Sequence, residues 1–91
     1  MAEPLPIVHR QEHGRFVMAE ERGELIYSLS PGRLTILHTE VEPALRGAGQ
    51  AARLVDAAVQ WARAQGLKVD SRCGYARVVL ARTPAHSDVL A

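Results

Sequence analysis

The chain has 91 residues and a mass of 9.9 kDa, a length at which a single domain over residues 1–91 is expected. Its hydrophobic fraction of 47% and charged fraction of 23% exclude an intrinsically disordered protein. Eleven basic residues against ten acidic ones leave a formal charge of +1. A charge this small excludes a general attraction to nucleic acid or to an anionic membrane surface.

The cysteine count and the N-terminus indicate a cytoplasmic protein. A lone cysteine, Cys73, permits no intrachain disulfide, which fits a reducing compartment. The first residues lack the basic and apolar segments of a secretory signal. The apolar runs are far shorter than the roughly 20 residues that span a bilayer. Metal-ligand spacing is also lacking, so we expect neither a membrane segment nor a metal site.

The first half of the chain has the pattern of short strands. Apolar and β-branched runs predict strands at 7–10, 15–19, 25–29 and 34–41. Short polar or glycine-containing clusters separate them, and Ser30-Pro31-Gly32 is the strongest turn signal. Four runs joined by short turns predict an antiparallel meander.

The second half changes to helical periodicity. The apolar residues Ala51, Leu54, Val55, Ala58 and Ala62 lie on one helical stripe, and Gly66 stands where a terminating glycine belongs. Residues 67–69 predict a short strand. A second helix follows through 75–82, with Asp70 or Ser71 as its cap and Pro84 as its stop. The predicted fold is α/β in the order β-β-β-β-α-β-α: a mixed, mostly antiparallel sheet of about five strands with two helices. Its fourth and fifth strands are parallel or splayed.

The segment 42–51 joins the fourth strand to the first helix and contains the strongest chemical signal. Gly47 and Gly49 allow a ligand to approach the backbone closely. The unpaired N–H groups of the helix start, the helix dipole and Arg46 all favour an anion such as a diphosphate. The alternative is a plain strand-to-helix turn that uses its glycines for geometry alone.

These residues resemble a known family. Arg46-Gly47-Ala48-Gly49-Gln50-Ala51 is similar to the Arg/Gln-x-x-Gly-x-Gly/Ala loop of the GCN5-related N-acetyltransferases. His38-Thr39-Glu40-Val41 and Cys73-x-Tyr75 resemble the very short, single-domain subgroup of that family. The resemblance extends from about Phe16 to Leu90. Gln50 and Ser71 depart from the pattern, which often has an apolar residue and a proline there. The chain also lacks the extra elements that shape the acceptor pocket of larger members.

The resemblance implies a site for acetyl-coenzyme A. It assigns cosubstrate binding to the backbone of Val41 and of the loop Arg46, Gly47, Ala48, Gly49, Gln50 and Ala51. One of these N–H groups would polarise the thioester carbonyl. The acceptor site of so short a chain would be shallow, open, or completed by a partner.

Four side chains are candidate catalytic residues. His38 or Glu40, on the same side of a strand, would take the proton of the amine. Each has an alternative structural role, His38 in holding the strands and Glu40 in orienting a neighbour. Tyr75 resembles the family's acid that protonates the leaving thiolate, or it packs on the sheet. Cys73 is either a transient acyl carrier or a small buried hydrophobic residue.

The remaining aromatic and charged residues have simpler expectations. Phe16, Tyr27 and Trp61 are expected in the core or at its rim, and His9, His13 and His86 are expected to be solvated. The helix face that carries Arg53, Asp56, Gln60 and Arg63 is expected to be a solvated surface. As a minor hypothesis, Arg53 reaches a phosphate from one turn inside the helix.

The function that follows is acyl transfer from acetyl-coenzyme A to a primary amine, on a small molecule or a protein. One alternative is a coenzyme A or acyl-coenzyme A binding module without turnover. Another is a protein-interaction domain that keeps the fold only for packing.

Overall fold

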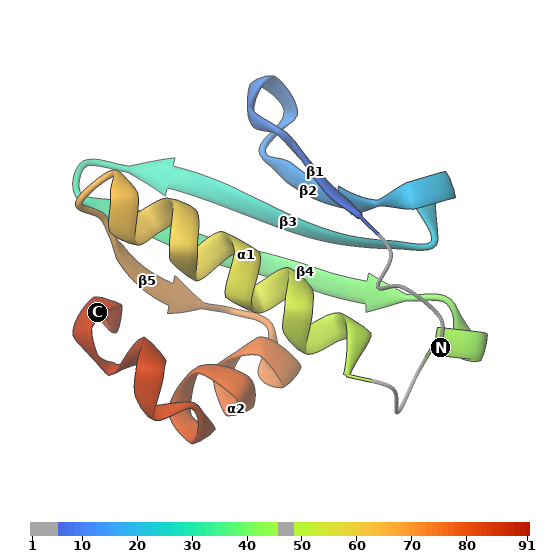
Figure 1. The fold of residues 1–91 in the computed structure, drawn as a ribbon. Helices are drawn as coiled ribbons and strands as arrows, with labels where there is room; N and C mark the ends of the chain where they lie inside the picture. The colour runs from blue at the N-terminus through green and yellow to red at the C-terminus, as the bar shows by residue number, and fades with distance from the viewer. Residues whose placement is uncertain (1–5, 46–48) are drawn as a thin grey trace.

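A computed structural model describes residues 6–45 and 49–91 and contains one sheet with helices on one face (Figure 1). Its strands, in spatial and chain order alike, are β1 (Ile7–Arg10), β2 (Arg15–Met18), β3 (Gly23–Ser30), β4 (Arg33–Val41) and β5 (Lys68–Ser71). Neighbours are antiparallel from β1 to β4, and β5 is parallel to β4. The predicted meander, strand number and parallel final pair are all confirmed.

The first helix, α1 (Gln50–Ala64), covers the middle of the sheet and buries the predicted apolar stripe. Leu54, Val55, Ala58 and Ala62 are fully buried and pack in one core with strand residues such as Leu34. Gly66 follows the helix in the left-handed conformation, with φ of 71°. The N–H groups of Leu67 and Gly66 bond to the carbonyls of Ala62 and Arg63, so the predicted glycine ends α1 in a Schellman motif.

The second helix, α2 (Gly74–Arg82), begins later than its predicted cap. The N-cap residue is Cys73, and neither Asp70 nor Ser71 caps the helix. Ser71 instead uses its hydroxyl within the preceding turn, where it accepts from the Cys73 N–H (3.0 Å) and donates to the Cys73 carbonyl (2.9 Å). The helix ends before Pro84, as predicted, since proline removes a backbone donor.

A 3₁₀ helix, η4 (Pro84–Val89), follows α2 and covers part of the polar face of α1 that was expected to be solvated. Asp56 and Gln60 on this face are exposed, as expected. Arg63 donates to both carboxylate oxygens of Asp88 in η4, at 2.7 and 2.8 Å. This hydrogen-bonded pairing lowers the pKa of Asp88 to about 2. Asp56 faces His86, which is only 2% exposed, so the expectation that His86 is solvated is also wrong. The C-terminal segment therefore covers part of the surface that helical periodicity alone leaves open.

His9 is likewise not a solvated residue, because it belongs to an aromatic cluster beneath the C-terminal half of α1. Its ring stacks on Phe16 with centroids 4.0 Å apart and meets the edge of Trp61 at 4.7 Å. The His9 Nε2 atom and the Tyr27 hydroxyl are 2.6 Å apart and hydrogen-bonded. Burial lowers the pKa of His9, and the nearby charge of Glu12 opposes that shift only in part. The folded protein therefore favours the neutral ring.

Stability should fall with acidification because of this histidine. A lowered pKa in the folded state means that the unfolded chain binds the proton first. The contribution of His9 is therefore complete above about pH 6.5 and is lost as the pH falls towards the lower folded-state value. We expect His9→Gln to flatten the pH dependence of urea unfolding in this window. His13→Gln, at an exposed histidine of the adjoining turn, should leave it unchanged; equal slopes for both variants would contradict the assignment.

Within residues 6–45 and 49–91, no helix combines the length and the apolar character that a membrane crossing requires.

Candidate active site

The site is built on β4, which is paired with β5 along only part of its length. β5 pairs only with the segment of β4 from Arg33 to Ile36, and the last bond runs from the Arg72 N–H to the Ile36 carbonyl (2.8 Å). The remainder of β4, as far as Val41, is paired with β3 on one edge, and β5 does not extend along the other. A ligand with hydrogen-bonding groups can therefore add to this open edge in the way that another strand would.

A β-bulge lies where β4 parts from β5. Ile26 pairs with His38 but the next residue of β3, Tyr27, pairs with Ile36, so Leu37 is an extra residue. Because side chains alternate between the faces of a strand, one extra residue exchanges the faces for everything that follows. Accordingly Ile36 before the bulge and Val41 after it both point into the core.

The register also fixes which backbone groups are available at the open edge. The Glu42 N–H points towards β3, where it donates to the carbonyl of Arg22 (2.9 Å). Successive backbone groups of a strand point to opposite edges, so the N–H groups of Thr39 and Val41 point towards the open side. Two donors spaced along the strand are thus available to a carbonyl-rich ligand.

The start of α1 faces this edge across the site. Gly49 is the N-cap of the helix in the left-handed conformation (φ of 77°), and it forms no side-chain capping bond. The first turn of α1 also contains no acidic residue. Its N–H groups and dipole are therefore available to an anion. The predicted ligand-binding residues Arg46, Gly47 and Ala48 lie outside the described residues.

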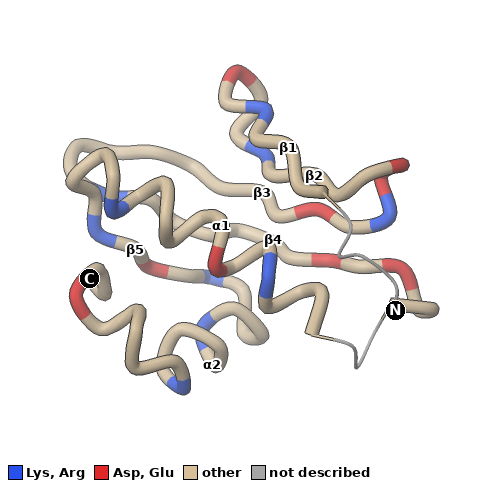
Figure 2. The backbone as a smooth tube through the Cα atoms, in the orientation of Figure 1, with Lys and Arg blue, Asp and Glu red and all other residues tan. Residues whose placement is uncertain are grey.

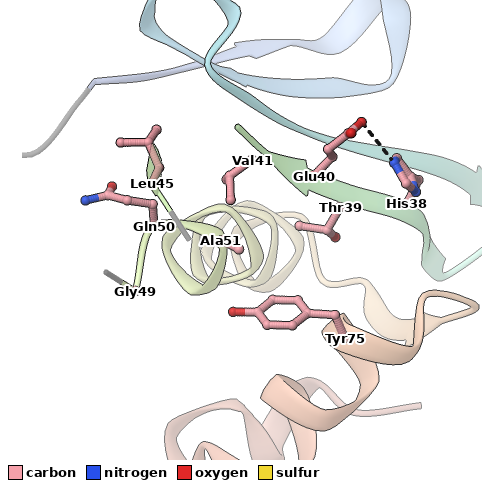
Figure 3. A pocket seen from close by; sticks show the side chains of 9 residues that line it. All are labelled: His38, Thr39, Glu40, Val41, Leu45, Gly49, Gln50, Ala51 and Tyr75. Carbon is pink, nitrogen blue, oxygen red and sulfur yellow. Dashed lines mark hydrogen bonds and ion pairs between the residues drawn. The ribbon is translucent and has the colours of Figure 1, made fainter. Parts of the chain in front are cut away.

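A cavity of about 560 Å³ connects these features (Figure 3). Nine residues from β4, the segment before α1, α1 and α2 line the cavity: His38, Thr39, Glu40, Val41, Leu45, Gly49, Gln50, Ala51 and Tyr75. The structure thus brings together all the described members of the predicted cosubstrate site, and three of the four predicted catalytic residues. The exception is Cys73.

His38 and Glu40 lie on the outer face of β4. Their side chains are hydrogen-bonded at 3.4 Å and are both more than half exposed. In Figure 3 they point away from Tyr75, whereas Thr39 and Val41 point towards the α1 side of the strand. The pair is thus open to a molecule that approaches from solvent over the outer face.

Tyr75 lies on the opposite side of β4, in the first turn of α2. Its side chain is 47% exposed, and its hydroxyl points towards the beginning of α1 (Figure 3). Cys73, two residues earlier, is half-buried against the core and does not line the cavity. The two candidates therefore differ in their access to a ligand bound along β4.

A second cavity, of about 320 Å³, shares Glu40 and Val41 with the first and has an acidic lining. Glu21, Glu24, Glu40 and Glu42 contribute carboxylates. Glu42 is paired with Arg22 and Glu24 with Arg15, which leaves Glu21 and Glu40 without an arginine partner among the described residues. Figure 2 shows the acidic positions on the adjoining parts of β3 and β4. The outer approach to Glu40 is therefore negatively charged.

Two residues of the main cavity carry no role in the sequence analysis. Thr39 is part of the quoted His-Thr-Glu-Val segment, but its inward position depends on the bulge. Leu45 ends the 3₁₀ helix Pro43–Leu45 and forms an apolar wall, and no periodic pattern marks it. Among the described residues, no group of three or more potential metal ligands comes together.

The splayed strand pair, the open edge and the helix start define an acetyltransferase-like architecture. The family model for the GCN5-related N-acetyl-transferases matches residues 15–89, and the chain belongs to this family. A search of curated proteins found no match.

Solved structures give the same result for the fold. A GCN5-like putative N-acetyltransferase from Staphylococcus aureus is 24% identical, with a TM-score of 0.75 over 99% of this chain and 91% of its own. An integron cassette protein from the mobile metagenome of Cole Harbour Salt Marsh is 18% identical, with a TM-score of 0.56 over 75% of this chain and 49% of its own. Nourseothricin acetyltransferase has a TM-score of 0.52 at 25% identity, over 68% of this chain and 42% of its own.

Proposed function

We propose that this protein transfers an acetyl group from acetyl-coenzyme A to a primary amine. The observation that carries the proposal is the open edge of β4, which faces the uncapped start of α1 across one cavity in a member of this family. Acetyl-coenzyme A supplies the acetyl group as an activated thioester. Its amide-containing arm suits the strand edge, and its diphosphate suits the helix start.

Backbone groups would supply the electrostatic part of catalysis. The N–H groups of Thr39 and Val41 point towards the open edge, and one of them would donate to the thioester carbonyl as negative charge develops on its oxygen. Fixed backbone donors need no reorganisation during the reaction. Holding the thioester and the amine together in this cleft would further accelerate the reaction, because the two reactants no longer have to meet in solution.

The outer face of β4 would receive the amine. Glu40 or His38 would take its proton, since both are exposed there and within 3.4 Å of each other. The acidic lining of the adjoining cavity supports an amine acceptor, because a protonated amine is attracted to carboxylates. Tyr75, on the inner side of the strand, would give a proton to the departing thiolate. Cys73 would take part as an acyl carrier only if its side chain turned towards the cavity.

The test is a titration and an assay with the full chain. We expect acetyl-coenzyme A to bind with micromolar affinity by calorimetry, and free thiol to appear when a panel of primary amines is added. Binding without thiol release from any amine would overturn turnover and favour a binding module. No binding at millimolar acetyl-coenzyme A would overturn the proposal and favour a protein-interaction domain.

A further inference from the structure

The outer face of α2 is exposed although its centre is apolar. Five residues form this face, which we call the α2 surface: Tyr75, Arg77, Val78, Ala81 and Arg82. Each lies three or four positions from another of the five, the spacing that makes residues neighbours on a helix. The buried residues Ala76 and Leu80 hold the opposite side of α2 against the core. Val78, at 50% exposure, is therefore an apolar contact point that the fold itself does not use.

The α2 surface is also positively charged. Residues 71–87 contain three arginines, Arg72, Arg77 and Arg82, and no acidic residue. None of the three forms an ion pair with a carboxylate of residues 6–45 or 49–91. Arg77 donates to the carbonyl of Ser71 (2.9 Å), a neutral acceptor that leaves its charge uncompensated. A partner that fits this surface is therefore acidic and brings an apolar group to Val78.

The α2 surface adjoins the acetyl-transfer site. Tyr75 belongs to both, because its side chain lines the main cavity and is 47% exposed. The Tyr75 hydroxyl points towards the beginning of α1, where we place the diphosphate (Figure 3). The two helices contact each other on the same face of the sheet (Figure 1). A protein bound to α2 would therefore lie beside the entrance of the cavity.

We propose that the α2 surface docks a small acidic protein that carries the acetyl group on a phosphopantetheine arm, and that this carrier is a second acetyl donor. This inference rests on the proposed function. The arm of such a carrier has the same amides and the same thioester as acetyl-coenzyme A, and a phosphate joins it to the protein. The open edge of β4 and the start of α1 would receive this arm as they receive the coenzyme. Carboxylates of the carrier would bind Arg77 and Arg82.

The reaction of the carrier is the same acetyl transfer. The amine nitrogen attacks the thioester carbonyl, so that a C–N bond forms and the C–S bond breaks. Glu40 or His38 takes the proton of the amine, and Tyr75 gives a proton to the sulfur. The products are the acetylated amine and a carrier with a free thiol.

The test compares an acidic acyl carrier protein, loaded with acetate as its thioester, with acetyl-phosphopantetheine, which is the same arm without the protein. Thiol release with an amine from the panel gives kcat/KM for each donor. For the wild-type protein we expect kcat/KM to be about tenfold higher with the carrier, the gain from a complementary charged surface. The double variant Val78→Glu, Arg82→Glu should lose this advantage. Its kcat/KM with acetyl-coenzyme A should stay within about twofold at physiological salt, which screens distant charges.

A matched control lies on β1, away from the site. The double variant Val8→Glu, Arg10→Glu makes the same two exchanges at a valine that is 51% exposed and at an exposed arginine. It should keep the advantage of the carrier. The single variant Arg82→Gln, which only removes a charge, should lose part of the advantage without placing a carboxylate on the helix. Circular dichroism would confirm that all three variants are folded.

The outcomes separate this inference from the proposed function. Equal kcat/KM for the carrier and the free arm in the wild-type protein would overturn the docking surface and leave transfer from acetyl-coenzyme A standing. An advantage that survives in Val78→Glu, Arg82→Glu would place the carrier elsewhere and also overturn the inference. If neither acetyl-coenzyme A nor the loaded carrier releases thiol with any amine, the proposed function and this inference both fail.

Discussion

Gly49→Val is expected to abolish measurable binding of acetyl-coenzyme A while the protein remains folded. Gly49 adopts φ of 77°, a conformation that a β-branched residue strongly disfavours. A valine would strain or shift the first turn of α1, and its side chain would stand where we place the diphosphate. Calorimetric titration should show at least a hundredfold loss of affinity. Thermal unfolding should show a smaller change, on the order of 1–3 kcal/mol for one strained residue.

The other end of the same helix provides a matched control. Gly66 also adopts a left-handed conformation (φ of 71°). At either glycine an added Cβ would meet no atom of the described residues within 4 Å, apart from the immediate chain neighbours. Gly66→Val should therefore cost stability of the same order through strain, yet keep acetyl-coenzyme A binding. Loss of binding in both variants would mean that the effect is global, and retained binding in Gly49→Val would remove the helix start from the site.

The fold was predictable wherever one local signal dominates. The apolar stripe of α1 repeats at helical spacing and ends at Gly66, so its burial and its Schellman termination both follow from the sequence. Four short apolar runs with turn signals between them likewise define the meander from β1 to β4. The loop before α1 could be recognised because it combines glycines with a helix start, a pattern that has a physical reason.

The orientation of the candidate site could not be predicted in the same way. With uninterrupted alternation from Leu34 and Ile36, His38 and Glu40 would point into the core beside α1. The extra residue Leu37 places them on the outer face instead. No glycine or proline marks this bulge, because its cause is tertiary: β4 has to part from β5 while it stays paired with β3. One residue thus decides from which side an amine approaches.

The burial of His9 and His86 also could not be predicted from the local sequence. His9 and Trp61 are far apart in the chain, and only the packing of α1 on the sheet brings their rings together. His86 is buried because η4 folds back onto α1, where Arg63 binds Asp88. A single polar residue in a short segment carries no periodic signal, so such contacts emerge only from the assembled fold.

Tyr75→Phe would test whether the proton donor for the thiolate lies on the inner side of β4, opposite the groups that take the proton of the amine. If Tyr75 is the acid for the departing thiolate, loss of its hydroxyl should lower kcat about a hundredfold, the lower end of the range for a general acid. The affinity for acetyl-coenzyme A should stay unchanged, because the ring still lines the cavity. Steady-state thiol release together with calorimetry would separate these two quantities.

The second tyrosine of the chain is the natural control. Tyr27→Phe removes a hydroxyl that bonds to His9 in the aromatic cluster, outside the cavity lining. It should lower stability and leave kcat intact. An unchanged kcat in Tyr75→Phe combined with lost turnover in Cys73→Ala would assign the chemistry to the thiol instead. Such a result would require Cys73 to leave its half-buried place against the core, so the same assay also reports whether the start of α2 rearranges when substrate binds.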